Sequence, residues 1–169
     1  IHHLHMVHAD AHPGNFMFNE KGEVTVLDFG CVKEFPDDFY TDYFKIHDRG
    51  LTYDDVELEK WLYDLSFLSE KDSENEKRLF RSVFTEMVRL LGRPFHEATF
   101  DFGNEEFFRS IFALGERISR TKEVRNSKNP RGSRHGLYIN RTYFGLYQLL
   151  NGLQANIKTG KSRFNRLVA

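Results

Sequence analysis

The chain has 169 residues, of which 40% are hydrophobic and 29% are charged. This composition is typical of one globular domain or of one lobe of a larger protein. It excludes a disordered chain, a collagen-like repeat and a coiled coil. The net charge is −1, but residues 1–116 hold 24 acidic and 12 basic side chains, whereas residues 117–169 hold 1 acidic and 12 basic ones. The basic end is therefore expected to pack against the acidic part; phosphates, anionic lipid or an acidic partner are the alternatives.

The N-terminal segment, residues 1–36, is predicted to contain a helix end, a loop and a β-hairpin. Residues 1–7 have the pattern of the end of a helix, and the Pro13-Gly14 pair makes the polar run at 8–15 a loop. Two short apolar runs, separated by an Asn-Glu-Lys-Gly turn, predict a hairpin at about 16–27.

Beyond Pro36 the hydrophobic periodicity changes from that of strands to that of amphipathic helices. The expected helices cover about residues 37–49, 53–67, 74–91, 104–120 and 137–157. Gly92 and Pro94 are expected to end the third helix, because proline breaks a helix interior. The segment 121–136 is polar and basic, so it is expected to be an exposed loop between a helical core at 37–120 and a terminal helix with a basic tail at 137–169.

The residues that suggest chemistry lie in the polar loop and just after the hairpin. His8, Asp10 and Asn15 share the loop, and Asp28 follows across the predicted hairpin. A hairpin brings its two ends together, so Asn15 and Asp28 are expected to be neighbours. Phosphoryl transfer needs one carboxylate to orient the attacking hydroxyl and separate oxygen ligands to hold Mg²⁺ on the phosphates. Asp10, Asn15 and Asp28 supply these three groups.

The spacing His-x-Asp-x4-Asn, followed by Asp-Phe-Gly, resembles the catalytic loop and the DFG motif of the protein-kinase-like superfamily. The octapeptide His-Ala-Asp-Ala-His-Pro-Gly-Asn at 8–15 more closely resembles the HADPHPGN signature of the UbiB/AarF family, atypical kinase-like ATPases linked to quinone biosynthesis. The motifs cover about residues 8–30, and the later helices fit a kinase C-lobe in general character. The resemblance therefore implies a mainly helical α+β fold over residues 1–169, the C-lobe of a protein-kinase-like protein.

The resemblance gives the loop residues distinct roles. Asp10 corresponds to the catalytic aspartate, and His8 corresponds to the residue that braces the catalytic loop. His12 corresponds to the second histidine of the UbiB-type and small-molecule-kinase loops. Ala11 is a departure, because the family usually has proline there; the change can loosen the loop but removes no ligand.

The resemblance also implies ATP and Mg²⁺ as cofactors. Their expected binding residues are Asn15, Asp28, Phe29 and Gly30, with Asn15 and Asp28 as the metal ligands. The Gly-rich loop, the strand lysine, its helix glutamate and the Lys-x-Gly-Gln element of the family do not occur in the 169 residues. The chain is therefore expected to be a C-lobe whose N-lobe is missing, and to lack full activity by itself.

Three functions are compatible with these residues. The first is ATP- and Mg²⁺-dependent phosphoryl transfer or ATP hydrolysis of the UbiB/AarF type, supporting quinone biosynthesis, with an acceptor that the sequence does not identify. The second is a small-molecule kinase of the aminoglycoside or choline type, which shares the loop but more often follows it with Asp-Phe-Glu or Asp-Trp-Glu, so Gly30 argues against it. The third is a pseudokinase-like regulator that binds nucleotide and scaffolds quinone-synthesis proteins.

Five of the eight histidines lie within the first twelve residues, which raises the alternative of a transition-metal site. A helix would place His2, His3 and His5 at poorly converging angles. No binuclear His-x-His-x-Asp-His pattern is present either. His8 and His12 are therefore better explained as loop braces.

The remaining signals concern surfaces, partners and location. Cys31 is expected to be a small packing residue, with a redox role as the alternative. Arg131, Arg134 and Arg141 are expected to be solvated, with a phosphate or a lipid headgroup as the alternative. One cysteine, and the lack of a secretory signal or an apolar spanning stretch, favour the cytoplasm, with the inner face of a membrane as an optional peripheral contact. The expected partners are the missing N-lobe, a phosphoryl acceptor and quinone-biosynthesis proteins, but not nucleic acid, because the basic tail lacks aromatic residues in a stacking pattern.

Overall fold

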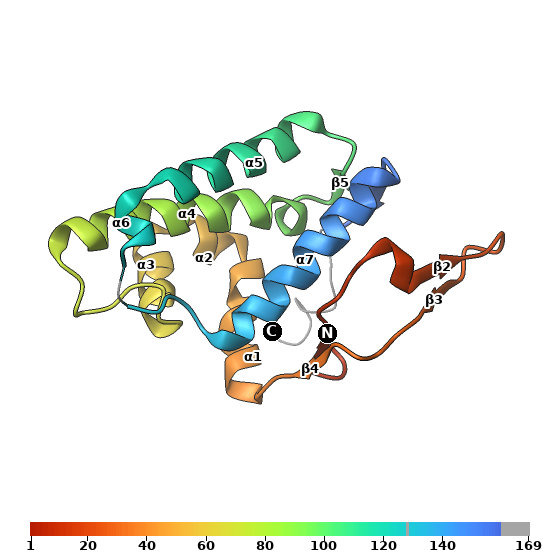
Figure 1. Ribbon diagram of the computed structural model, residues 1–169, viewed down its shortest axis with the longest axis horizontal. Coiled ribbons are helices and arrows are strands. Elements are labelled where there is room, and N and C mark those ends of the chain that lie inside the picture. The colour runs from red at the N-terminus through yellow and green to blue at the C-terminus, as the bar shows by residue number, and fades with distance from the viewer. Residues whose placement is uncertain (128, 160–169) are drawn as a thin grey trace.

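The computed structural model describes residues 1–127 and 129–159 (Figure 1). Its helices are η1 Pro13–Asn15, α1 Asp37–Phe44, η2 Lys45–His47, α2 Arg49–Tyr53, α3 Asp55–Asp64, α4 Glu74–His96, α5 Glu105–Arg120, α6 Lys122–Arg125 and α7 Arg134–Gly152. Its strands are β1 Met6–His8, β2 Phe16–Phe18, β3 Val24–Val26, β4 Val32–Glu34, β5 Thr99–Asp101 and β6 Asn156–Lys158. The expected mainly helical α+β class is confirmed for the described residues.

The short strands form antiparallel pairs. β1 pairs with β4, with Met6 opposite Glu34, and β5 pairs with β6. β2 pairs with β3, with Phe16 opposite Val26, which confirms the predicted hairpin. Figure 1 shows this hairpin projecting away from the helices, next to the segment that carries β1.

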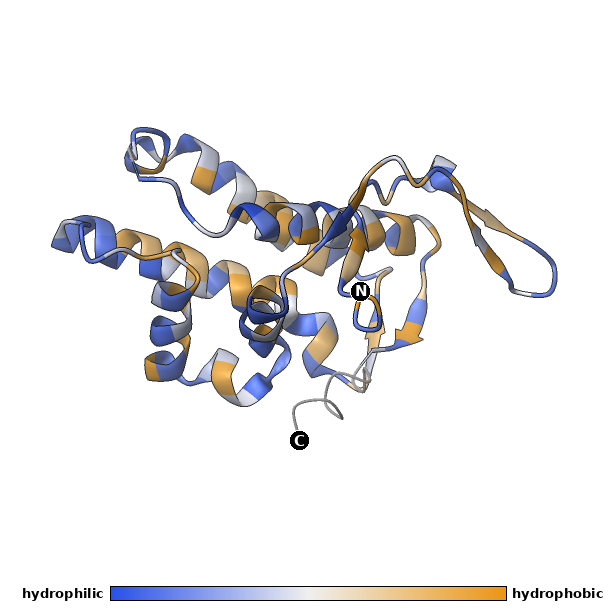
Figure 2. Cartoon of the chain, turned by 90° about the horizontal axis from the view of Figure 1, so that it is seen from below, coloured by the Kyte–Doolittle hydropathy of each residue, from blue (hydrophilic) through white to orange (hydrophobic). Residues whose placement is uncertain are grey.

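The helices bury their apolar faces in a core rich in aromatic residues. The main cluster includes Phe44 from α1, Leu62 from α3 and Ile139 from α7, each with 0% of its surface exposed. A second cluster, from the β5 region, α5 and α7, contains Phe100, Phe102, Phe107 and Tyr147. α7 therefore contributes to both clusters, and Figure 1 shows it running towards β5. Figure 2 shows hydrophobic and hydrophilic residues alternating along the helices, as amphipathic helices require.

Side-chain caps set where the longer helices begin. The hydroxyl of Ser73 accepts from the backbone N–H of Glu76 while the carboxylate of Glu76 accepts from the backbone N–H of Ser73, a capping box that starts α4. Asn104 caps α5, and Ser133 caps α7. Asp48 accepts from the backbone N–H of Gly50 and starts α2. This cap separates α2 from η2, so the helix expected at 37–49 is not continuous but consists of α1, η2 and the start of α2.

Two expectations about helix boundaries are wrong. Residues 1–7 do not end a helix but form turns and enter β1, because β4 supplies a pairing partner that the local pattern does not reveal. α4 does not end at Gly92, and it continues past Pro94. Its last turn is held by packing, since the Phe95 ring stacks on the His47 ring with centroids 4.1 Å apart. Tertiary contacts here override the helix-breaking effect of proline.

The last expected helix, at 137–157, is shifted towards the N-terminus. α7 begins at Arg134 and ends at Gly152, and the residues after it form β6. β6 forms because β5, far away in the sequence, offers an edge to pair with. The basic tail from residue 160 onwards lies outside the described residues.

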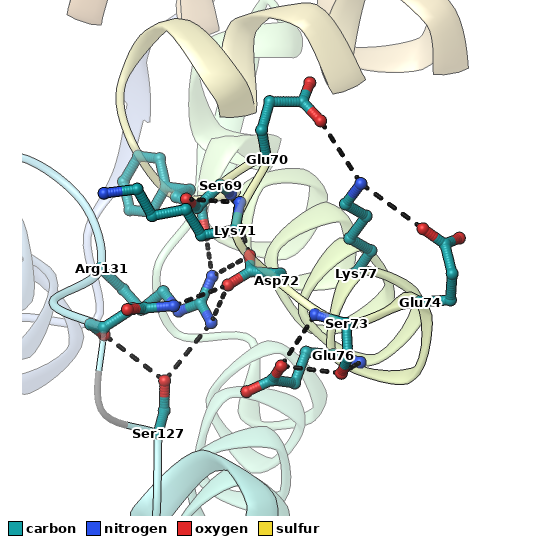
Figure 3. Close-up of polar contacts among 12 residues, drawn as sticks. Ser69, Glu70, Lys71, Asp72, Ser73, Glu74, Glu76, Lys77, Ser127 and Arg131 are labelled. Carbon is teal, nitrogen blue, oxygen red and sulfur yellow. Dashed lines mark hydrogen bonds and ion pairs between the residues drawn. The ribbon is translucent and has the colours of Figure 1, made fainter.

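Arg131 is not solvated, so this expectation is also wrong (Figure 3). Its Nη1 and Nη2 atoms donate to the carboxylate of Asp72 at 2.5 and 2.9 Å, and Asn129 Nδ2 donates to the same carboxylate at 3.0 Å. The guanidinium carbon also lies 3.8 Å from the centroid of the Phe80 ring, in a cation–π contact. The segment before α7 is thus tied to the loop between α3 and α4.

A second ion pair joins the basic end of the chain to its acidic part. Arg117 on α5 pairs with Glu86 on α4. Together with the pair between Arg131 and Asp72, this contact shows that two of the basic residues pack against the acidic part, as expected. Arg134 and Arg141 are exposed.

Candidate functional site

The polar loop at 8–15 and the Asp-Phe-Gly triplet meet at the base of the hairpin. The backbone N–H of Leu27 donates to the carbonyl of Asn15 at 2.8 Å, which continues the pairing of β2 with β3 and brings Asp28 next to Asn15. The backbone N–H of Ala9 donates to the carbonyl of Cys31 at 2.8 Å, which continues the pairing of β1 with β4. The two strand pairs therefore hold the loop and the triplet side by side.

Asn15 is fixed by Asp10 within the loop. Its Nδ2 atom donates to the backbone carbonyl and to carboxylate Oδ2 of Asp10, both at 3.0 Å. Because the amide nitrogen is used in these bonds, the amide oxygen is the atom of Asn15 that is left for a ligand. The side chain of Asp10 is exposed, so a substrate can reach its carboxylate.

Asp28 lies in a tight turn at the end of the hairpin. Its backbone is left-handed, with φ 53°, a region that aspartate enters more readily than most residues. Carboxylate Oδ1 accepts from the backbone N–H of Gly30 at 2.8 Å, which fixes the side chain and leaves Oδ2 unused by this bond. The turn therefore presents one carboxylate oxygen of Asp28 to solvent beside the loop.

His8 connects the loop to the triplet. Its Nε2 atom lies 2.6 Å from the carbonyl oxygen of Asp28, and its Nδ1 atom lies 3.3 Å from the backbone nitrogen of Asp10. A carbonyl can only accept, so these partners assign the proton to Nε2 and leave Nδ1 to accept from Asp10. One imidazole thus spans the two aspartates, a geometry that supports the predicted bracing role of His8.

His12 shapes the second half of the loop. Its Nδ1 atom accepts from the backbone N–H of Gly14 at 3.0 Å and caps η1. The backbone N–H of His12 donates to the backbone carbonyl of Asp10 at 2.7 Å. These bonds support a loop-bracing role. Phe29 is 68% exposed, and its ring centroid lies 6.1 Å from that of His8.

Comparison with known proteins finds similarity in the segment that carries this site. Residues 1–61, which contain both the polar loop and the Asp-Phe-Gly triplet, match the family model of the ABC1 atypical kinase-like domain. This part of the chain is similar to that family. The resemblance to the UbiB family is therefore confirmed, and a match to a kinase-like family implies ATP binding.

One curated relative is similar over part of the chain. It is "Atypical kinase COQ8B, mitochondrial" from Danio rerio, which is 30% identical over 108 residues. The matched part is 63% of this chain but 17% of the relative, so the chain spans only a small share of that protein. No helix within the described residues has both the length and the apolar character needed to cross a bilayer.

His2 and His5 in this N-terminal segment contact helix α1. His2 Nδ1 lies 2.8 Å from the hydroxyl of Tyr40, and His5 Nδ1 lies 2.6 Å from a carboxylate oxygen of Asp37. Burial lowers the pKa of His2 to about 4. In the part of the chain that the structure describes, no three His, Cys, Asp or Glu side chains are grouped so that they could hold a metal ion. Cys31 is half-buried and packs against the main core cluster.

Sequence reasoning missed two residues that contact the polar loop from the far end of the chain. The hydroxyl of Thr142 donates to the carbonyl of His8 at 3.0 Å. Gly145, one turn later on α7, lies against Ala11. Neither residue belongs to a motif, and the contacts span the length of the domain, so only the tertiary structure reveals them.

Proposed function

We propose that this chain supplies the catalytic loop and the metal-binding segment of an atypical kinase or ATPase of the UbiB type. The observation that carries the proposal is the hydrogen-bonded link among three groups in the ABC1 segment. Asn15 binds Asp10 through its amide nitrogen, and His8 joins Asp10 to Asp28. A link of this kind holds the three groups in one fixed arrangement before substrate arrives, as catalysis by positioning requires.

In the proposed reaction, Asp10 orients the attacking hydroxyl or water and accepts its proton. The attacking oxygen forms a bond to the γ-phosphorus of ATP, the bond between that phosphorus and the β,γ-bridging oxygen breaks, and ADP leaves with the electron pair. The exposed carboxylate of Asp10, held on one side by Asn15, suits this role.

The residues present fit a bound Mg²⁺ ion. Asn15 offers its amide oxygen and Asp28 offers Oδ2, two hard oxygen donors from adjacent segments. Mg²⁺ prefers such donors and usually takes only one or two protein ligands, with phosphates and waters completing its shell. When bound, the ion would neutralise charge on the transferred phosphoryl group. The role of this chain is to hold Asn15 and Asp28 in place for the ion.

The hairpin beside the site favours a further lobe as a partner. Met17, Phe18, Val24 and Phe29 are 58%, 53%, 54% and 68% exposed, although all four are large apolar residues. Such side chains rarely gather on a surface that faces only water. We infer that the ATP-binding lobe of the complete protein covers them, which places the nucleotide between that lobe and Asp28.

The physiological role that we propose is support of quinone biosynthesis. This proposal rests on the UbiB character of the octapeptide at 8–15 and on the similarity to COQ8B. The acceptor of the phosphoryl group is either water or a hydroxyl-bearing molecule.

The proposal is tested with Asp28→Asn in the complete protein that carries this chain. The change keeps the shape of the side chain but removes the charge that holds the ion, so ATP turnover should fall by about a hundredfold or more. Glu20→Gln is the matched control, because Glu20 is exposed at the hairpin turn and carries no role in the site. If Asp28→Asn turns over ATP as fast as Glu20→Gln does, the assignment is wrong.

A further inference from the structure

Helix α7 contacts the polar loop so closely at Gly145 that no side chain fits at this position. A Cβ atom at Gly145 would lie 2.4 Å from the backbone carbonyl oxygen of Ala11 and 2.8 Å from its Cβ atom. Both distances are far shorter than a van der Waals contact, and the first involves backbone that cannot turn away. Glycine at 145 is therefore required for the loop to keep its path beside Asp10.

A second contact fixes the same loop one turn earlier on the helix. The hydroxyl oxygen of Thr142 lies 3.0 Å from the carbonyl oxygen of His8 and 3.0 Å from that of Tyr138 within α7, so its single hydrogen is shared between the loop and the helix. Thr142 is only 5% exposed, so water does not readily replace this bond. The two α7 contacts are on either side of Asp10, one at His8 and one at Ala11.

α7 itself is fastened to the helical body along its length. The hydroxyl of Tyr43 on α1 donates to Asn140 at 2.8 Å, and the hydroxyl of Tyr147 donates to the carbonyl of Leu91 on α4 at 2.8 Å. Asn151 reaches the backbone near β5. Because these hydrogen bonds fix α7 to the core, the contacts of α7 with the loop hold the loop in a fixed position relative to the core.

We propose that Thr142 and Gly145 are positioning residues that hold the loop around Asp10 in its catalytic geometry. This inference rests on the proposed phosphoryl-transfer function, and it extends the site to a helix that lies outside the segment matched to the ABC1 family. Neither residue touches a reacting atom. They act through the backbone on both sides of the carboxylate that orients the nucleophile.

The test compares Gly145→Ala with Gly152→Ala in the complete protein. Both changes add one methyl group to α7, but a Cβ atom at Gly152 meets no atom within 4 Å. Because a displacement of about 1 Å at a catalytic group can cost about a hundredfold in rate, Gly145→Ala should lower kcat by about that factor. The KM for ATP should change little, because the loop is displaced at the nucleophile and not at the nucleotide. Gly152→Ala should keep the kinetics of the unaltered protein.

Thr142 gives a second pair of variants in case Gly145→Ala fails to fold. Thr142→Val keeps the shape of the side chain but removes the donor, and Thr142→Ser keeps the donor. Loss of one hydrogen bond to the loop should lower kcat by up to about tenfold in Thr142→Val. Thr142→Ser should restore most of the rate, a rescue that a role in packing alone does not predict.

Hydrogen exchange measured on the same proteins separates this inference from the proposed function. Displacement of the loop should speed amide exchange at residues 9–16 in Gly145→Ala, while exchange in α4 stays unchanged. If this occurs but even the unaltered protein does not turn over ATP, the positioning contact stands and the proposed function fails. If Gly145→Ala matches Gly152→Ala in both exchange and kcat, or if its exchange rises equally throughout the core, the inference is overturned.

Discussion

Breaking the buried pair between Asp72 and Arg131 should remove a large part of the stability of this fold. The side chain of Asp72 is 0% exposed and that of Arg131 is 12% exposed. Asp72→Asn leaves the guanidinium buried without a counter-charge, a change that typically costs about 3–5 kcal/mol. Domains of this size are stable by about 5–15 kcal/mol, so the loss is a substantial fraction of the total. Arg131→Met should also destabilise, and the double variant should cost less than the sum of the single changes.

Urea unfolding followed by tryptophan fluorescence measures this effect in the chain. Trp61 is the only tryptophan and is 3% exposed, so its emission reports the packing of the main core. Glu105→Gln is the control, because it breaks a pair with Arg109 whose side chains are 86% and 74% exposed. Such a surface pair is worth less than about 0.5 kcal/mol. An Asp72→Asn effect no larger than that of Glu105→Gln would refute the reasoning.

The pH dependence of the same pair follows from the pKa of Asp72. Burial alone raises this pKa, but hydrogen bonds from Arg131, Ser69 and Asn129 lower it by more, so that it falls below its ordinary value. A carboxyl whose pKa is lower in the folded state contributes stability above the pKa of the unfolded chain, which is about 3.9. This stability is lost as the pH falls through the folded-state value. When the pH is lowered below about 4, the free energy of unfolding should therefore fall less in Asp72→Asn than in the unaltered chain.

Further predictions concern a buried histidine and a strained glycine. Burial, together with smaller effects of His2 and His96, lowers the pKa of His47 to about 3, whereas an unfolded histidine titrates near about 6.5. Between these two pKa values the unfolded chain binds more protons than the folded chain. Lowering the pH from 7 to 5 should therefore reduce the free energy of unfolding by about 2 kcal/mol through His47. His47→Gln should remove this loss, as measured by urea titrations at both pH values. Gly132 has φ 73°, and a Cβ atom added there would lie 2.7 Å from the Phe67 ring. Gly132→Ala should therefore lower the free energy of unfolding by about 1–3 kcal/mol, which is measured as a lower unfolding midpoint. An unchanged midpoint would contradict this account of the turn.

Local sequence patterns predicted the hairpin and most of the helices because their causes are local. The apolar runs and the turn between them are enough to specify the pairing of β2 with β3. Ser73 and Asn104 start their helices through bonds to residues three positions ahead, which a sequence pattern contains. That Asn15 and Asp28 lie close to each other follows from the same hairpin.

The errors arise where a distant partner decides the outcome. Residues 1–7 become turns and a strand because β4 pairs with them, and Arg131 is buried because Asp72 neutralises it. Neither partner is adjacent in sequence, and no local periodicity indicates the pairing. The same reason explains why the contacts of Thr142 and Gly145 with the loop were not predicted, since helix α7 reaches that loop only in the folded chain.

Nucleotide binding with and without Mg²⁺ tests the central claim most directly. The claim is that Asp28 holds the ion on ATP whereas Asp10 acts on the nucleophile. In the complete protein, Asp28→Asn should lose the part of ATP affinity that depends on Mg²⁺, and Asp10→Asn should keep that affinity while losing turnover. If Asp28→Asn binds ATP with the same dependence on Mg²⁺ as the unaltered protein, the metal site is not where this account places it.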